Sequence, residues 1–402
     1  MTSPAARYPQ SHSKLNVRSG MPLLASPVFS KKIVYLFACL ACLTISFNLA
    51  AIIAVIPNIS REFRLPDFFV SKIISFYLLP YGAAALIYAP LTRYFAYAQI
   101  YFWSLIIYAT ASLICAFTSS IDVLFWARAV TGIAAAGVIP LGLMLIGEFF
   151  EKNVRGKLVG FFFSCTFIGS LAGMLTSGFC HWRWLFYIPA ILGLFLVVVC
   201  YLMREGALAK VHGVRINYRE SLSNIRIFRV LIFIFVLSFL YHGVNTWYGI
   251  YLDRVYQLNK LHISLILAMT LVVSIFGQIA GGYLSDIKGR VWTCSLGVIG
   301  LGVSTMLLWT QHSLIMVTII LSLIALFWTI GHNGTSTILT DFEEEHRAVL
   351  ASLNSSVRFV SAGLGFLVSG VFTRQSFGLT FLAIGILIIL LSTMITYSLK
   401  QR

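Results

Sequence analysis

Charged residues are scarce in this chain. Only 10% of its 402 residues are Asp, Glu, Lys or Arg, whereas 59% are hydrophobic, and the mean hydropathy is +0.90. A globule of that composition has too little polar surface to remain dispersed in water. The shortage of charge therefore excludes an ordinary water-soluble protein and predicts one that uses the lipid bilayer as its main solvent.

Motifs of several functional classes are also missing. The seven cysteines are scattered, with no C-x-x-C pair and no histidine at ligand spacing, which disfavours a metal or redox centre. We find no nucleotide-binding G-x-x-x-x-G-K-[ST] loop and no H-E-x-x-H motif. The sequence thus predicts no cofactor and no direct use of ATP.

Basic residues separate the apolar runs of the chain and form no long stripe, although Lys and Arg outnumber Asp and Glu by 29 to 13. This distribution disfavours a nucleic-acid partner. A helix needs about 20 apolar residues to cross the roughly 30 Å hydrocarbon core. Twelve such runs predict an all-α integral membrane protein with twelve transmembrane helices, at 33–57, 69–91, 99–117, 121–150, 155–179, 184–203, 229–251, 261–285, 291–311, 313–341, 347–373 and 377–398.

The basic residues also predict an orientation. With the N-terminus inside, and with basic residues at span ends counted with the adjoining segment, the cytoplasmic side holds 20 Lys and Arg, the external side holds seven, and Arg128 and Arg358 lie within spans. By the positive-inside rule, both termini lie in the cytoplasm. The run after the polar first 32 residues is about 25 residues long, too long for a signal-peptide core. We therefore expect a retained first helix and an integral protein of the bacterial inner (plasma) membrane.

Landmarks recur at an offset of 192 or 193 residues, which indicates an internal repeat. Phe47 corresponds to Phe239, and Gly173 corresponds to Gly365. The longest segment between spans separates the two copies. We predict a cytoplasmic tail at 1–32, an N-terminal six-helix bundle at 33–203, a cytoplasmic linker at 204–228, a C-terminal six-helix bundle at 229–398 and a cytoplasmic C-terminus at 399–402.

Residues 282 to 290 read GYLSDIKGR and resemble the loop motif after the second helix of a half in the major facilitator superfamily. The resemblance covers about residues 33 to 398. Gly282 and Gly289 would allow a tight turn between two helices. The resemblance implies a set of gating contacts that close the cytoplasmic side: Asp286 with the start of span five near Arg155, and Arg290 with Asp341.

The first-half copy of this loop, at 89 to 96, departs from the family pattern. Arg93 occupies the acidic position and Ala96 replaces a glycine. Glu148, at the cytoplasmic end of span four, is an alternative partner for Arg93.

Two other segments carry the resemblance. Residues 128 to 137 read RAVTGIAAAG and resemble the fourth-helix motif whose arginine, here Arg128, is often tied to proton coupling. Span five has glycines at the spacing of the family's antiporter motif, although Met174 and Ser177 replace two of its residues. Small residues there let helices approach closely and bend. Those glycines are Gly160, Gly169, Gly173 and Gly178.

A charged side chain near the bilayer centre costs about 2.5 to 3.5 kcal/mol on insertion scales, so its presence indicates a structural or functional role. Arg358 shares one helix face with Asn354, Ser361 and Gly365. We expect that face to line a central cavity, and the alternative is an arginine paired with backbone carbonyls for packing. For Arg128 the alternative is that its long stem reaches the membrane interface.

Other polar residues within spans are candidates for binding a substrate or protons. His242 can share a face with Tyr241, Asn245 and Tyr248, and His332 follows Trp328 by one helical turn. The alternative for each histidine is a hydrogen-bonded packing role. Asn48 occupies a region of the first span where many proton-coupled drug exporters of the family carry a carboxylate.

The central parts of the spans contain no Asp or Glu. Two arginines and two histidines without a central carboxylate disfavour organic cations, so we expect an anionic, zwitterionic or neutral amphiphilic substrate. The resemblance to the drug and metabolite efflux branch implies a monomeric secondary transporter, an exporter by proton antiport, with small-molecule substrate, protons and lipid as partners. The alternatives are an importer of an organic anion or nutrient, and, in another class, a transport-dead sensor or membrane enzyme.

Overall fold

The computed structural model describes residues 31–203, 217–340 and 347–399. In these ranges the elements are helices, with no strand among them. Ten helical stretches are long and apolar enough to cross a membrane, and a shorter apolar helix covers Phe377–Ser392. With a broken first span the helices make twelve crossings, so the all-α, twelve-helix membrane fold predicted from the sequence is confirmed.

The helices before the linker form what we call the N-terminal bundle. Its six spans are α1 with α2, α4, α5, α6 with α7, α8 and α9. The bounds are α1 (Lys31–Ser46), α2 (Ile52–Phe63), α3 (Asp67–Val70), α4 (Lys72–Leu91), α5 (Tyr97–Phe117), α6 (Ile121–Ala135), α7 (Val138–Phe149), α8 (Lys152–Phe179) and α9 (Trp184–Met203).

The helices after the linker form the C-terminal bundle. A short helix, α10 (Tyr218–Ser223), precedes it. The bounds are α11 (Ile225–Asn245), α12 (Tyr248–Tyr256), α13 (Lys260–Lys288), α14 (Arg290–Met306), η1 (Leu307–Trp309), α15 (Leu314–Thr340), α16 (Arg347–Thr373), α17 (Phe377–Ser392) and α18 (Ile395–Leu399).

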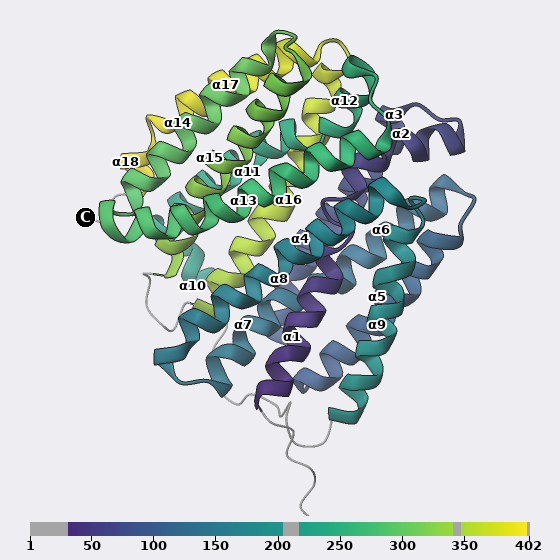
Figure 1. The fold of residues 1–402 in the computed structure, drawn as a ribbon. Helices are drawn as coiled ribbons and strands as arrows, with labels where there is room; N and C mark the ends of the chain where they lie inside the picture. Colours follow the sequence, from purple (N-terminus) through teal and green to yellow (C-terminus); the bar gives the residue numbers. More distant parts are fainter. Residues whose placement is uncertain (1–30, 204–216, 341–346, 400–402) are drawn as a thin grey trace, which may run out of the picture.

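The two bundles lie side by side and meet along two helix pairs, α4 with α16 and α8 with α13 (Figure 1). We call the end where α1 begins and α18 ends the terminal end, and the opposite end, which carries α3, the loop end. The α4 and α16 helices approach closely because Gly82 and Gly363 lie between them. A Cβ at Gly363 would lie 2.8 Å from the Leu79 side chain, and one at Gly82 would lie 2.6 Å from Val360.

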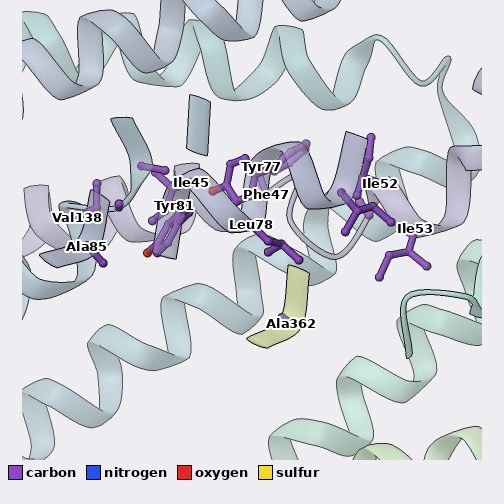
Figure 2. Packing of buried hydrophobic residues seen from close by; sticks show 14 of the residues in the cluster. Ile45, Phe47, Ile52, Ile53, Tyr77, Leu78, Tyr81, Ala85, Val138 and Ala362 are labelled. Carbon is purple, nitrogen blue, oxygen red and sulfur yellow. The ribbon is translucent and has the colours of Figure 1, made fainter. Parts of the chain in front are cut away.

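Apolar and aromatic side chains fill this interface. The Tyr81 ring of α4 stacks on Phe359 of α16 at 3.7 Å between centroids. Figure 2 shows Leu78 and Ala362 within the buried cluster that joins the bundles. The Ser75 hydroxyl donates to the Gly363 carbonyl at 2.9 Å, so a polar contact fixes the register of the two helices.

The first span is broken, whereas the sequence predicts one helix over 33–57. Residues 47–51 form a turn between α1 and α2, and α2 continues to Phe63. Pro57 lacks the N–H that would bind the Ile53 carbonyl. Gly249 of α12 approaches that carbonyl so closely that a Cβ on Gly249 would lie 1.9 Å from its oxygen. Both features lie within α2, just after the break, and hydropathy alone does not predict either the break or these contacts.

Equivalent glycines pack in the same way in the two bundles. A Cβ on Gly173 of α8 would lie 1.6 Å from the Phe47 oxygen, and a Cβ on Gly365 of α16 would lie 2.1 Å from the Phe239 oxygen. Both pairs obey the repeat offset of 192 residues that the sequence shows. Helix α8 therefore rests on the break after α1 as α16 rests on α11, because only glycine permits these approaches.

Candidate functional site

A cavity of about 310 Å³ lies between the bundles near the middle of the spans. Eight of the polar and aromatic candidates predicted from the sequence line it. The lining residues that the structure describes include neither aspartate nor glutamate. The predicted residues on the wall are Arg128, Tyr241, His242, Asn245, Tyr248, Trp328, His332 and Arg358.

Aromatic rings form much of the wall on the C-terminal bundle. Tyr241 of α11 and Trp328 of α15 stack with centroids 3.8 Å apart and ring planes 4° from parallel. The edge of His242 meets Trp328 at 5.6 Å, and His332 lies 5.6 Å from the same indole. The spacing of four between Trp328 and His332 places both on one face of α15. These four rings form one group, which we call the aromatic wall.

The hydrogen bonds of His242 define its tautomer. Its Nδ1 lies 2.8 Å from the Ser238 carbonyl oxygen, which can only accept, so Nδ1 carries a hydrogen. In the neutral ring Nε2 is then a hydrogen-bond acceptor, and it becomes a donor when the ring is protonated. The histidine thus has one nitrogen committed to the backbone and one left for proton exchange.

Arg358 of α16 lies beside the aromatic wall. Its Nε donates to the Asn354 Oδ1 at 2.8 Å, and its Nη2 donates to the Thr335 Oγ1 at 3.3 Å. The Ser238 hydroxyl donates to the Arg358 backbone carbonyl at 3.2 Å, which ties α11 to α16. Asn354 does not line the cavity itself and instead orients the guanidinium. Arg358 keeps part of its surface exposed to the cavity.

Arg128 lies on the opposite wall and is almost entirely buried, with 1% of its surface exposed. Its Nη1 donates to the Asn48 Oδ1 at 3.3 Å, and its Nε donates to the Ile73 carbonyl at 3.5 Å. The guanidinium lies 4.3 Å from the centre of the Tyr77 ring. The alternative in which Arg128 extends to the interface is therefore wrong, because its partners hold it inside the bundle.

The predicted gating residues lie at the terminal end. Gly289 adopts φ 86°, a left-handed backbone that favours glycine, between α13 and α14, whereas Gly282 lies within α13. Asp286 is exposed and its charge acts on Arg290. Asp341 lies outside the described residues, so its predicted pairing with Arg290 stays a prediction.

Contacts across the bundles at this end differ from the expectation. The Arg155 Nε donates to the Phe150 carbonyl at 2.7 Å, within its own bundle. Among the residues described, no ion pair joins Asp286 to Arg155. Glu148 interacts with Tyr97 of its own bundle. Gly169 and Gly173 pack α8 against α1, since a Cβ on Gly169 would lie 2.4 Å from the Leu43 oxygen.

Sequence reasoning missed a set of contacts at the loop end. Arg61 of α2 forms an ion pair with Asp253 of α12. Arg254 donates to Asp67 at 2.8 Å. We call these four residues the loop-end clamp, because each pair joins the two bundles. One signal was available: Arg61 and Asp253 are 192 residues apart, which is the repeat offset.

Further polar contacts accompany the clamp. The Lys260 Nζ donates to the Cys180 carbonyl at 2.9 Å, and the hydroxyls of Ser177 and Ser264 lie 2.8 Å apart. Glu62 accepts from Trp182 and Arg183 of its own bundle. Partial burial acts to raise the pKa of Glu62, but these two donors outweigh it and hold the pKa below its usual value. The loop end is thus tied together by contacts within and between the bundles.

The sequence model of the Major Facilitator Superfamily matches residues 36–270 and 230–402, so the chain belongs to that family. Membership places it among integral membrane transporters, a class without enzymatic activity, and the membrane-enzyme alternative no longer stands.

Relatives of known description include a drug-resistance protein and efflux pumps. The puromycin resistance protein pur8 of Streptomyces alboniger is 29% identical over 153 residues, which cover 37% of this chain and 30% of that protein. The efflux pump aflT of Aspergillus parasiticus is 33% identical over 39% of this chain and 32% of that protein. The matched region thus spans about a third of these relatives' length. The MFS-type transporter YwfA of Bacillus subtilis is 24% identical over 78% of this chain and 79% of that protein.

A solved structure shares the fold. It is that of a bacterial homologue of the human lysosomal transporter Spinster in an inward-facing and unoccupied conformation. The TM-score is 0.75 over 94% of this chain and 99% of that chain, at 16% sequence identity. At that identity the likeness shows the fold alone.

Proposed function

We propose that this transporter is a secondary active exporter that moves a small organic solute through the central cavity by alternating access, in exchange for protons. The observation that carries the proposal is a cavity between two bundles that receives cationic side chains from both, Arg128 and Arg358. A site shared by two rocking bundles can be exposed to each side of the membrane in turn. The similarity to efflux pumps supports the outward direction.

The loop-end clamp supports an assignment of the conformation. If the termini lie in the cytoplasm of a bacterial inner membrane, as the distribution of basic residues favours, the loop end faces outward. The clamp then closes the outer side, and the structure corresponds to a state that exchanges solute with the cytoplasm. The gating contacts expected of Asp286 and Arg290 would form when the bundles rock to the opposite state.

Proton coupling has few available carriers. His242 and His332 line the cavity, and the unperturbed pKa of a histidine side chain is the closest to neutral pH among protein side chains. Glu148 and Asp341 lie near the cytoplasmic ends of their spans. We assign the coupling to the histidines first, because a proton on either ring adds positive charge beside Arg358 and changes the affinity for an anion.

The lining of the cavity also favours one class of substrate. Cationic and aromatic lining favours an anionic, zwitterionic or neutral amphiphilic solute over a lipophilic cation. A central cavity lined by residues of a single chain supports action as a monomer, with protons, the solute and the bilayer as partners.

The test compares metabolites inside and outside cells that lack the protein, overproduce it, or overproduce Arg358→Ala. Export predicts that at least one anionic or amphiphilic solute accumulates inside the deletion strain and outside the overproducing strain. Accumulation inside the overproducing strain would instead show an importer, and no difference among strains would favour a sensor.

Arg358→Ala is expected to abolish transport while membrane insertion stays intact, because the guanidinium lies on the cavity wall. Insertion is checked by the amount of protein in washed membranes. Normal turnover of the identified solute by Arg358→Ala would remove Arg358 from the site.

A further inference from the structure

We infer that the aromatic wall and Arg358 together form a binding subsite for a planar aromatic carboxylate of one or two rings. The ring lies against the Trp328 and Tyr241 stack, and the carboxylate binds the Arg358 guanidinium. The inference rests on the proposed function, because it takes the central cavity as the transport site.

The stack offers a flat and rigid surface. Tyr241 is 8% exposed and stacks on Trp328 at 3.8 Å between centroids, whereas Trp328 keeps more of its surface exposed. The two histidine rings contact the same indole at 5.6 Å and restrain its orientation. A planar ring gains more from such a preorganised face than a flexible chain does, because offset stacking needs a flat partner.

Arg358 supplies the complementary charge at the edge of this surface. Its Nε and Nη2 donate to the neutral oxygens of Asn354 and Thr335, which fix the plane of the guanidinium. Its backbone carbonyl accepts from Ser238, one helical turn before His242, and its Nη2 donates to Thr335, three residues after His332, so it lies next to the aromatic wall. A guanidinium held in one plane is suited to a planar carboxylate, which it can bind through charge-assisted hydrogen bonds.

Arg128, on the wall of the N-terminal bundle, is less suited than Arg358 to bind the carboxylate. Arg128 is 1% exposed and already binds Asn48, the Ile73 carbonyl and the Tyr77 face. Arg358 keeps more of its surface exposed to the cavity than Arg128 does, so the carboxylate is assigned to Arg358. Apolar side chains including Leu49, Ile53 and Ile74 line the opposite wall and would cover the far face of the ring.

The size of the cavity limits the ligand. A volume of about 310 Å³ is at the lower end of the range of about 300 to 1,000 Å³ that small-molecule pockets occupy. One or two fused rings with a single carboxylate match both the volume and the single accessible guanidinium. Large polycyclic solutes would exceed this volume.

The experiment measures equilibrium binding of three probes to the purified full chain in lipid nanodiscs. The probes share a naphthalene ring: 1-naphthoate is anionic, 1-naphthamide is neutral and 1-naphthylmethylamine is cationic. We expect 1-naphthoate to bind at least tenfold more tightly than either of the others. Cyclohexanecarboxylate, which keeps the charge but lacks a planar ring, is expected to bind at least fivefold more weakly than 1-naphthoate.

Variants separate the two parts of the subsite. Arg358→Gln is expected to weaken 1-naphthoate at least tenfold and leave 1-naphthamide unchanged, and Arg358→Lys is expected to recover part of the loss. Trp328→Leu is expected to weaken both naphthalene probes about fivefold. Arg226→Gln removes a positive charge at the exposed start of α11 and should change nothing. Size-exclusion profiles show whether each variant is folded, and Arg358→Lys keeps the charge if Arg358→Gln fails.

The outcomes also separate this inference from the proposed function. Equal binding of the three probes, or 1-naphthoate binding that neither Arg358 variant changes, overturns the subsite. A solute exported by cells without any 1-naphthoate binding leaves the exporter standing and removes the subsite. Binding of 1-naphthoate with the expected variant pattern but without export of any solute supports the subsite and contradicts the exporter.

Discussion

Two glycines of α8 belong to the same sequence pattern but meet different surroundings. A Cβ on Gly173 would lie 1.6 Å from the Phe47 oxygen, whereas a Cβ on Gly160 would meet nothing within 4 Å. A clash with backbone cannot be relieved by a rotamer change, so α8 would have to move away from α1. Alanine should therefore destabilise the protein at Gly173 and be tolerated at Gly160.

Gly173→Ala is expected to destabilise the protein by about 1 to 3 kcal/mol, the usual cost of overpacking. Gly160→Ala is expected to leave stability unchanged or to raise it by up to about 1 kcal/mol, because alanine favours helix. Thermal unfolding in detergent, followed by fluorescence-detected size exclusion, measures both. An equal melting temperature for the two variants would contradict the packing described for α8 and α1.

Asn48 places a neutral oxygen where it accepts a hydrogen bond from Arg128. Asn48→Asp would put a negative charge against that guanidinium. At an effective dielectric constant of about 20, a charge about 10 Å away changes the energy of an anion by roughly 1 to 2 kcal/mol. We therefore expect export of the anionic solute to fall about tenfold.

Asn48→Ala is the control, because it removes the hydrogen bond without adding charge, and it should have the smaller effect. Initial rates in proteoliposomes with an imposed pH gradient compare the two variants. A rate for Asn48→Asp above that of Asn48→Ala would mean that the charge of Arg128 does not act on the solute.

Sequence reasoning succeeds for residues that are neighbours along one helix. Arg358 and Asn354 are four residues apart, and the hydrogen bond between them follows from helix geometry. The contact between Arg128 and Asn48 joins positions 80 residues apart. Both residues are predicted from the sequence, but only the packing of α6 on α4 and against the turn at 47–51 brings them together. Local periodicity carries no information about that distance.

Among the elements, the linker helix α10 has a specific contact with α4. The Tyr218 hydroxyl donates to the Leu86 carbonyl at 2.8 Å. Within an α-helix that carbonyl would accept from residue 90, but residue 90 is Pro90 and has no N–H. Burial raises the pKa of the Tyr218 phenol, so the hydroxyl stays protonated and able to donate. The linker thus satisfies an acceptor that the proline leaves open.

Tyr218→Phe is expected to destabilise the protein by about 1 to 3 kcal/mol, because it leaves a partly buried carbonyl without a donor. Pro90→Ala restores the missing N–H, so Tyr218→Phe should cost less in that background. A double-mutant cycle of thermal stability measures the coupling, with Tyr94→Phe as an exposed control. Additive effects of Tyr218→Phe and Pro90→Ala would show that the two residues do not share the Leu86 carbonyl.

The observed helix bounds show which ends of the spans hydropathy predicts correctly. The predicted spans at 184–203 and 347–373 coincide with α9 and α16. The predicted first span ended at 57, but α2 continues to Phe63, since a helix continues past the hydrocarbon core into polar residues. The break at 47–51 lies in an apolar run with no charge to mark it. Its cause lies in contacts with other spans, which a window of sequence does not contain.

At the scale of the whole molecule, composition predicts the fold. It does not predict which conformation the two bundles adopt relative to each other. Long apolar runs predict the crossings, because a bilayer accepts little else. The state of the two bundles depends on a few exposed ion pairs, each worth about 0 to 1 kcal/mol. Arg254 is 46% exposed in its pair with Asp67. Weak closing contacts suit the proposed alternating access, which would break them in every cycle.

Reversing one charge of the loop-end clamp should shift the balance of states. Arg254→Glu places two acidic groups together and is expected to open the loop end, whereas the exchange Arg254→Asp with Asp67→Arg should restore closure. Labelling of Asn245→Cys by an impermeant maleimide added outside intact cells measures opening, in a Cys180→Ser background. Labelling that is equal in the single variant and in the exchange would show that the clamp does not hold the loop end closed.

The pair of Arg61 and Asp253 has one more consequence, since the two positions correspond to each other in the repeat. In a symmetric dimer of two identical six-helix units, a position on the two-fold axis would face its own copy. An arginine would then meet an arginine and an aspartate would meet an aspartate, and both arrangements repel. A single covalent chain whose two copies have diverged can place opposite charges there. Joining the two units in one polypeptide therefore makes this ion pair between the bundles possible.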